Sequence, residues 1–359
     1  MILFNDFKSH YAAVRERVEP AVQRVLESGW YILGNELKNF ESRFAEWLGC
    51  PHAVGVASGT EAIALALMAA GIGPGDEVIT TCLTAYPTIV GIEQTGATPV
   101  LADIDPNSGL VDPAEIAKQI GPRTRAIVPV HLYGQVCDMD AIMALAEAHD
   151  LEVIEDCAQS TGATWNDQQS GTFGRFGCFS FYPSKNLGAF GDAGAVVAKS
   201  AADAQRLCEL RNYGQTERYH HEQVGINSRL DEMQAAILDA KLDLLHAANA
   251  RRIELAAAYR ERLMGVTPLP DQPGSVYHLF VLKVPGRDAF IEAMREAGVQ
   301  TLIHYPVPIH QQGAFRGRAD GEFANSAQFA DEIVSLPLYP EMSLEQLEQV
   351  VDAVKQVTG

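Results

Sequence analysis

Short apolar segments alternate with helical patterns between about residues 53 and 240, and this alternation limits the choice of fold most strongly. A chain that alternates strand and helix in this way predicts a mostly parallel mixed sheet with helices on both faces. In such a sheet the ligand site is expected at the carboxyl ends of the strands. The strands are expected within AVGVAS (53–58), GDEVIT (75–80), ATPVLADI (97–104), RAIVPVHLY (125–133), LEVIED (151–156), GCFSFY (177–182) and GAVVAK (194–199).

A second pattern begins after a long helical run at residues 228–264. A strand-like segment at 277–284 is followed by two further helical segments, the last near the C-terminus. We therefore expect a large α/β domain at residues 1–245 and a smaller C-terminal α/β domain at 246–359. The N-terminal segment is also expected to pack on the smaller domain. A chain of 359 residues with 47% hydrophobic content is long enough for two domains.

Lys185 is the residue with the most distinctive surroundings. It lies between the aromatic stretch FSFYPS and the glycine-rich stretch NLGAFGDAGA. Burial there favours the neutral amine, and a neutral amine can form a Schiff base with a carbonyl group. On its own this is a weak signal, because most lysines with apolar neighbours extend to solvent.

Two further elements strengthen this interpretation. Asp156 ends a predicted buried strand, and its carboxylate could keep a pyridine nitrogen protonated. The tripeptide Ser58-Gly59-Thr60 stands between a strand and a helix, where backbone N–H groups and the helix dipole can hold a phosphate. A turn at Asp156 and a simple N-cap at Ser58 are the ordinary alternatives. Together with Lys185, the set predicts a site for pyridoxal 5′-phosphate (PLP).

Several motifs of this chain resemble those of the DegT-like sugar aminotransferases and occur in the same order as in that family. The members of that family are PLP enzymes of fold type I. The resemblance covers almost the whole chain. Its motifs are SGWYILGNELKNFESRFAEWLG (28–49), SGTEAIALAL (58–67), GIGPGDEVIT (71–80), ATPVLADID (97–105), VPVHLYGQ (128–135), EDCAQS (155–160), FSFYPSKNLGAFGDAGA (179–195), LRNYGQTERY (210–219), GINSRLDEMQAAIL (225–238) and HYPVPIHQQ (304–312).

The resemblance implies a role for each cofactor-binding position. Lys185 would hold PLP covalently and then act as general acid and base. Asp156 would pair with the pyridine nitrogen, and Gln159 would lie close to the ring. The phosphate would be bound by Gly59, Thr60, Ser180 and, from the partner subunit of a homodimer, Asn227. One departure concerns Tyr86, because many relatives have an aromatic residue directly after Thr84, where this chain has Ala85; Tyr86 is assigned to cover the ring.

The same resemblance implies the reaction. The chain would move an amino group from glutamate, or glutamine, to a keto group of a nucleotide-linked sugar by a ping-pong mechanism. The motifs are most similar to the branch that acts at C3 of dTDP-3-keto-6-deoxyhexoses. Residues Tyr182, Tyr213, Arg229, Tyr305 and His310 would line the sugar site. Each of these tyrosines has packing as its alternative role.

Other substrates and another class of protein remain open. A UDP-linked keto sugar, a 4-keto sugar or a keto-cyclitol would use the same catalytic residues. A sugar dehydratase of this fold is disfavoured, because those relatives replace the lysine that this chain keeps as Lys185. A non-catalytic regulator that binds PLP or a sugar is a remote alternative, disfavoured by the retained set of Asp156, Ser180 and Lys185.

Composition points to a cytoplasmic enzyme. The formal net charge of −19 disfavours binding to nucleic acid. The six cysteines lack C-x-x-C spacing, the N-terminal segment lacks a signal-peptide core, and no apolar stretch approaches the length of a membrane helix. His304 and His310 could suggest a metal, but prolines separate them and no acidic or cysteine ligands stand nearby, so no metal is expected.

Overall fold

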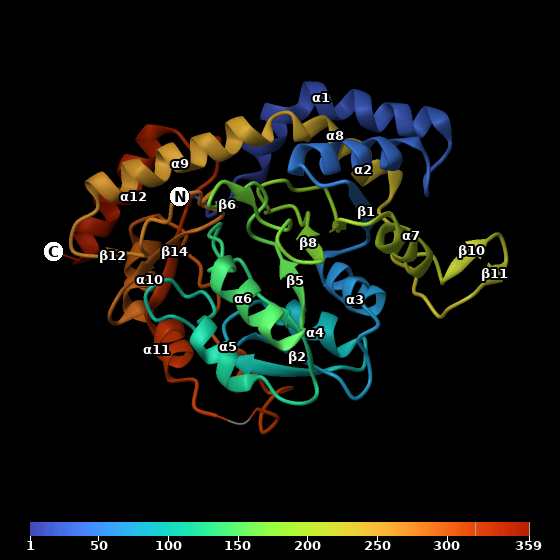
Figure 1. Cartoon of the computed structure of the whole chain (residues 1–359). Coiled ribbons are helices and arrows are strands. Elements are labelled where there is room, and N and C mark those ends of the chain that lie inside the picture. The colour runs from blue at the N-terminus through green and yellow to red at the C-terminus, as the bar shows by residue number, and fades with distance from the viewer. Residues whose placement is uncertain (320, 359) are drawn as a thin grey trace.

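The computed structural model describes residues 1–319 and 321–358, and its largest element is a seven-stranded sheet (Figure 1). The strand order is β1-β9-β8-β5-β4-β2-β3. Neighbours from β8 to β3 are parallel, whereas β9 runs antiparallel to both β8 and β1. The predicted mostly parallel mixed sheet is thereby confirmed. The strands are β1 (His52–Val56), β2 (Glu77–Thr81), β3 (Thr98–Ala102), β4 (Thr124–Val128), β5 (Glu152–Asp156), β8 (Phe176–Ser180) and β9 (Gly194–Ala198).

Helices cover both faces of this sheet because its strands are apolar on both sides. Consecutive residues of β8 show this, since Cys178 packs with residues of α3 and α7 while Phe179 packs with residues of α2 and α8. Side chains alternate along a strand, so two separate cores form. The helices of this part are α2 (Asn35–Leu48), α3 (Gly59–Ala69), α4 (Tyr86–Glu93), α5 (Pro113–Gln119), α6 (Met139–His149), α7 (Ala201–Leu210) and α8 (Glu232–Leu242).

The N-terminal helix α1 (Phe7–Ser28) lies alongside α8 at the top of Figure 1. Asp6 caps it by accepting hydrogen bonds from the N–H groups of Lys8 and Ser9, each at 3.1 Å. The helix ends at Gly29, whose φ of 64° is left-handed. Ahead of α1, Ile2 forms a bridge with Val299 in the C-terminal part of the chain.

The C-terminal part has a core of its own around a three-stranded antiparallel sheet of order β12-β13-β14. Its elements are α9 (Leu245–Arg262), β12 (Thr267–Pro268), β13 (Phe280–Lys283), α10 (Arg287–Glu296), the 3₁₀ helix η1 (Ile309–Gln311), α11 (Ala324–Glu332), β14 (Ile333–Leu336) and α12 (Leu344–Thr358).

The long helix expected at residues 228–264 is two helices. It begins only at Glu232, and a tight turn separates α8 from α9, in which the N–H of Leu244 bonds the carbonyl of Lys241 at 3.0 Å. Figure 1 shows the two as a nearly continuous rod that joins the two parts of the chain. No glycine or proline marks the break, so the sequence pattern did not reveal it.

Two short hairpins complete the described structure. One is β6 (Thr164–Trp165) with β7 (Gln168–Gln169), and the other is β10 (Gln215–Glu217) with β11 (His220–His221). The second projects away from the body of the molecule beyond α7 (Figure 1). None of the described helices combines the length and the apolar character needed to span a membrane.

Candidate functional site

The predicted lysine loop and several of the predicted cofactor-binding residues lie at one edge of the large sheet. Asp156 is the last residue of β5, Ser180 is the last residue of β8, and Gly59 follows β1. These strands run in the same direction, because β5 is parallel to β8, and β8 and β1 are both antiparallel to β9. Their carboxyl ends therefore meet at the same edge, where the loop carrying Lys185 also begins.

The start of α3 lies against the end of β8. A Cβ atom added to Gly59 would stand 2.7 Å from the Cβ of Ser180 and 3.3 Å from its Oγ. Ser58 caps the helix by accepting a hydrogen bond from the N–H of Glu61 at 3.2 Å. The first N–H groups of a helix have no partner within the helix, so those of Gly59 and Thr60, together with the nearby hydroxyl of Ser180, form a cradle suited to an anion.

The carboxylate of Asp156 is buried. Its Oδ2 accepts a hydrogen bond from the hydroxyl of Thr88 at 2.8 Å, and its Oδ1 accepts one from the N–H of Ala158 at 3.0 Å. Burial raises the pKa of Asp156, although these two hydrogen bonds and the charge of Lys185 act in the opposite direction. Both hydrogen-bond donors are neutral, so a protonated pyridine nitrogen would add a charged hydrogen-bond donor to this carboxylate.

The amine of Lys185 lies close enough to Asp156 for their charges to interact. Burial lowers the pKa of Lys185 from its ordinary value of 10.5 to about 8, and the carboxylate of Asp156 limits this shift. The loop turns at once after β8, with the N–H of Lys185 bonded to the carbonyl of Tyr182 at 2.8 Å. An appreciable neutral fraction near pH 8 suits an amine that must attack a carbonyl carbon.

Gln159 connects this edge to the C-terminal part of the chain. Its Oε1 accepts a hydrogen bond from the N–H of Tyr133 at 2.8 Å, and its Nε2 donates to the hydroxyl of Tyr305 at 2.9 Å. Burial, followed by the charge of Asp156, raises the pKa of Tyr305 to about 12. The phenol of Tyr305 therefore stays protonated next to the predicted ring site.

Two histidines also approach Lys185, and neither was assigned to the site from the sequence. Burial and the charge of Lys185 lower the pKa of His304 to about 4 and hold that of His278 well below its usual range. The Nδ1 of His304 is 2.9 Å from the hydroxyl of Ser335. Both rings are thus neutral near pH 7. The sequence flagged His304 only as a weak metal candidate, and no signal pointed to His278.

Two predicted site residues pack into a separate apolar cluster formed by Cys82, Ile89, Leu101, Ile309, Phe315 and Phe323. Tyr86, the first residue of α4, lies against this cluster. The Nδ1 of His310 is 2.9 Å from the Sγ of Cys82, and its ring packs on Phe323. The ring-covering role of Tyr86 and the sugar-binding role of His310 stay predictions.

Four other predicted residues are exposed or half-buried, and their side chains form no hydrogen bond with the side chain of Lys185 in the described structure. Tyr182 is 54% exposed directly before the lysine loop. Arg229 lies over the ring of Tyr213 at 5.6 Å from its centroid and donates to the Oδ1 of Asn212 at 3.2 Å. Asn227 is exposed and forms a backbone bridge with the same Asn212.

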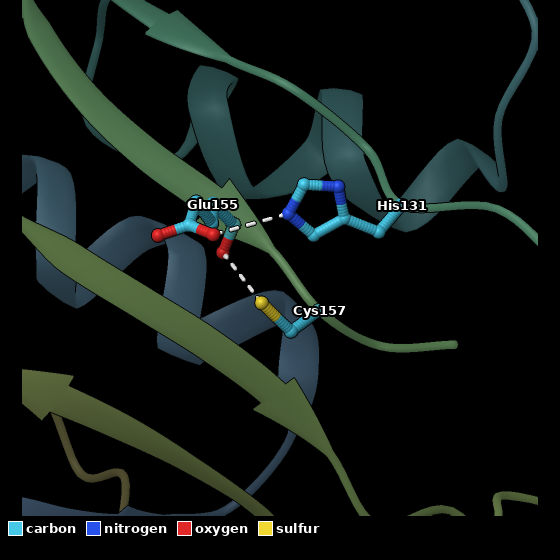
Figure 2. A group of neighbouring side chains, drawn as sticks. All are labelled: His131, Glu155 and Cys157. Carbon is cyan, nitrogen blue, oxygen red and sulfur yellow. Dashed lines mark hydrogen bonds and ion pairs between the residues drawn. The ribbon is translucent and has the colours of Figure 1, made fainter. Parts of the chain in front are cut away.

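A buried cluster of His131, Glu155 and Cys157 has the residue types of a metal site (Figure 2). The side-chain atoms that could bind a metal already have hydrogen-bond partners within the protein. Glu155 accepts hydrogen bonds from the N–H groups of residues 171, 173 and 174 at 2.7 to 2.8 Å and lies 3.1 Å from the Nε2 of His131. The Nδ1 of His131 accepts the N–H of Cys137 at 3.1 Å. The cluster therefore ties the loop after β7 to β5.

The arrangement fits PLP on three counts. The glycine at position 59 leaves space where a Cβ would fill the phosphate cradle. Asp156 is a buried carboxylate with neutral hydrogen-bond donors. Lys185 is a lysine whose pKa is lowered by burial.

The sequence analysis did not assign Thr88 to the site. Thr88 comes four residues after Thr84, and the two hydroxyls are 3.0 Å apart.

Comparison with known proteins gives consistent results. The profile described as the DegT/DnrJ/EryC1/StrS aminotransferase family matches residues 13–355. The chain is 46% identical to dTDP-3-amino-3,6-dideoxy-alpha-D-galactopyranose transaminase of Aneurinibacillus thermoaerophilus, over 99% of each chain. It is 43% identical to UDP-N-acetyl-3-dehydro-alpha-D-glucosamine 3-aminotransferase of Acidithiobacillus ferrooxidans, over 98% of this chain and 96% of the relative.

A solved structure extends this similarity to three dimensions. The crystal structure of DesV from S. venezuelae matches with a TM-score of 0.95 and 44% identity, over 99% of this chain and 97% of that chain.

Proposed function

This chain belongs to the DegT/DnrJ/EryC1/StrS aminotransferase family, and from this premise we propose that it transfers an amino group to the C3 keto carbon of a nucleotide-linked sugar. It is a PLP-dependent sugar aminotransferase. The observation that carries the proposal is the convergence of Asp156, Lys185 and the Gly59–Ser180 contact at one sheet edge.

The choice of C3 rests on the relatives that the chain matches over nearly its whole length. The names of both describe amination at C3, one on a dTDP-linked sugar and the other on a UDP-linked sugar. The dTDP-linked 3-keto-6-deoxyhexose is our first candidate, because the relative whose name contains a dTDP-linked sugar has the higher identity, 46%. A UDP-linked 3-keto sugar is the second candidate, supported by the relative at 43%.

The proposed roles follow from the contacts at the site. When bound, PLP supplies an electron sink for the carbon that gains or loses the amino group. Lys185 would hold the cofactor covalently and, once released, move a proton to or from that carbon. Asp156, fixed by Thr88, would keep the pyridine nitrogen protonated, while Gly59, Thr60 and Ser180 bind the phosphate. Glutamate as donor would use the same lysine in the other half of the ping-pong cycle.

The active form is proposed to be a homodimer with shared sites. Asn227, Arg229 and Tyr213 lie together on the segment that follows α7, apart from the lysine loop. Large aromatic side chains are exposed nearby, including Trp30 at 63%, two residues before Ile32, which forms a bridge with Asp231. Exposed aromatic surface of this kind favours a protein interface. A partner subunit would bring Asn227 to the phosphate of the opposite site and Tyr182 would face it.

The sharing of sites can be tested by mixing two inactive variants. Lys185→Ala and Asn227→Ala homodimers are unfolded together and refolded as a mixture. If each site combines Lys185 of one subunit with Asn227 of the other, half of the dimers regain one intact site, so about a quarter of wild-type activity returns. No recovery, with dimers present by sedimentation, would contradict shared sites.

A cytoplasmic location is part of the same proposal. It is supported by the six cysteines of the chain, all of which are free thiols, as expected in a reducing compartment.

The reaction itself is tested spectroscopically. The purified protein is treated with L-glutamate, which removes the visible band of lysine-bound PLP, and is then offered dTDP- and UDP-linked 3-keto and 4-keto sugars one at a time. Return of the band with a 3-keto sugar, and the mass of an amino sugar product, would support the proposal. Return only with 4-keto sugars would overturn the C3 assignment.

A further inference from the structure

The loop that carries Lys185 is not closely packed on all sides. Residues 183–187 line a cavity of about 350 Å³, whose other walls come from α1, from α8 and α9, and from residues 339–341. Lys185 itself is on the wall of this cavity, whereas Asp156, Ser180 and Gln159 do not line it. On the cavity side, the position of the loop depends on individual hydrogen bonds rather than on dense packing.

Two buried side chains from the α8–α9 rod supply hydrogen bonds to this loop. Lys241 donates from its Nζ to the carbonyl of Gly188. Asn249 accepts a hydrogen bond at its Oδ1 from the Nδ2 of Asn186 at 2.8 Å. Asn186 directly follows Lys185, so fixing its side chain fixes the backbone from which the reactive amine extends.

Asn249 also holds the loop that follows Asp156. Its Nδ2 donates to the carbonyl of Thr161 at 3.0 Å. The adjacent Gly162 has a left-handed φ of 91°, and a Cβ there would stand 2.7 Å from that Nδ2. A single amide side chain therefore bridges the loop of Lys185 and the loop of Asp156, and the backbone leaves room for it only because residue 162 is glycine.

Two further contacts of Asn186 are made with residues near β13. Its Nδ2 also approaches the carbonyl of Val276 at 3.3 Å, and its Oδ1 is 3.0 Å from the Nδ1 of His278. Because the Nδ2 of Asn186 already donates, its Oδ1 must accept, and His278 must carry its proton on Nδ1. His278 is 6% exposed, and burial followed by the charges of Lys185 and Arg252 holds its pKa well below the usual range. The neutral ring can therefore keep this hydrogen bond throughout the physiological pH range.

We propose that Asn249 and His278 are positioning residues for the aminotransferase reaction, and that they act through Asn186 to hold the Lys185 amine opposite Asp156. The proposal rests on the assignment of Lys185 as the cofactor lysine. Over the two half-reactions the lysine would release its covalent bond to the cofactor once and re-form it once, and a fixed loop would confine that movement to its own side chain. Misplacement of a reacting group by about 1 Å can reduce the rate by about 100-fold.

The principal test uses Asn249→Leu, which has a similar size and lacks both hydrogen bonds. In the holoenzyme we expect kcat to fall by about 10- to 100-fold, while the KM for the sugar changes by less than about threefold. In the cofactor-free protein, the rate at which an amine-reactive reagent labels Lys185 is followed against pH by mass spectrometry. The pKa of Lys185, about 8 in the wild type, should rise toward 10.5 as the loosened loop admits water.

A second variant and a control separate positioning from general stability. His278→Phe keeps an aromatic ring but removes the Nδ1–H donor. It should also lower kcat and raise the pKa of Lys185. Gln272→Leu is the matched control, because this amide also makes two hydrogen bonds, with the N–H and carbonyl of Val136 at 2.7 and 2.9 Å, outside the lysine loop. It should destabilise the protein without changing the pKa of Lys185.

The outcomes distinguish this inference from the proposed function. Wild-type kcat and an unchanged Lys185 pKa in either folded variant would overturn the positioning role, as would an equal shift in Gln272→Leu. If the wild-type protein shows no lysine-bound PLP band, the assignment of Lys185 fails and the inference fails with it. If the band is present but the variants at Asn249 and His278 behave like the wild type, the positioning role fails and the proposed function is retained.

Discussion

Replacing Gly59 by alanine tests the phosphate cradle with a single methyl group. The new Cβ would lie 2.7 Å from the Cβ and 3.2 Å from the Cα of Ser180, where ordinary contacts begin at 3.4 Å. Either α3 or the end of β8 must then move by roughly 0.7 Å, and overpacking of this kind costs about 1 to 3 kcal/mol. The displaced atoms include the N–H groups expected to bind the phosphate.

Two effects follow from that displacement. Losing one hydrogen bond to a charged group costs about 1.5 to 3 kcal/mol, so the affinity for PLP should fall about 10- to 100-fold. The apoprotein should lose stability as well. Unfolding entropy of about 2.1 cal/mol/K per residue gives a fall in Tm of roughly 1.3 °C for each kcal/mol in a chain of this length.

The assay is titration of the apoprotein with PLP, followed by the absorbance of the lysine-bound cofactor, with Tm measured in parallel. Gly313→Ala is the control, because a Cβ at Gly313 meets nothing within 4 Å and should leave both quantities unchanged. Wild-type PLP affinity and Tm in Gly59→Ala would refute the close approach of α3 to β8 on which the cradle depends.

Three further predictions test other parts of the site. Thr88→Val removes a hydrogen bond to the carboxylate of Asp156, so PLP affinity measured by the same titration should fall about tenfold with little change in fold by circular dichroism. Lys185 has a lowered pKa when folded, so the unfolded chain binds more protons between pH 8 and 10.5 and apoprotein stability should rise with pH in that window. In urea unfolding, Lys185→Met should be more stable than the wild type, by the largest margin below pH 8 and by no margin at pH 10.5. A difference in unfolding free energy that stays constant with pH would contradict the lowered pKa. Glu155→Ala should cost more than about 3 kcal/mol in urea unfolding, because three backbone N–H groups lose their acceptor; a loss below 1 kcal/mol would be inconsistent with the buried network.

The sequence could predict the sheet because its strands are continuous apolar runs with clear ends. Each of the seven expected strands overlaps an observed one. The groups at the strand ends were also predictable, since a polar residue at the end of a buried strand, as at Asp156 and Ser180, must lie at the sheet edge. The break between α8 and α9 could not be predicted, because it depends on how the two parts of the chain pack and not on a glycine or proline.

The supporting residues of the site could not be predicted either. Asn249 lies in an ordinary helical pattern, and its contacts with Asn186 and Thr161 join loops that are far apart in the sequence. The contact between His310 and Cys82 likewise joins residues far apart in the sequence, and no local pattern predicts it. Local patterns reveal which residues end strands and cap helices, whereas side-chain partners across the fold depend on tertiary packing.

The antiparallel strand β9 has a consequence for how the chain folds as it is synthesised. β1 pairs within the large sheet only with β9, and the two are separated by about 140 residues, so the edge of β1 stays open until most of the large sheet has been made. The helix α3 that begins just after β1 carries the phosphate cradle and shares this delay. An unpaired strand edge favours association between unfinished chains. We therefore expect the yield of refolding to fall steeply with protein concentration, and the addition of PLP to help only after β9 has closed the sheet.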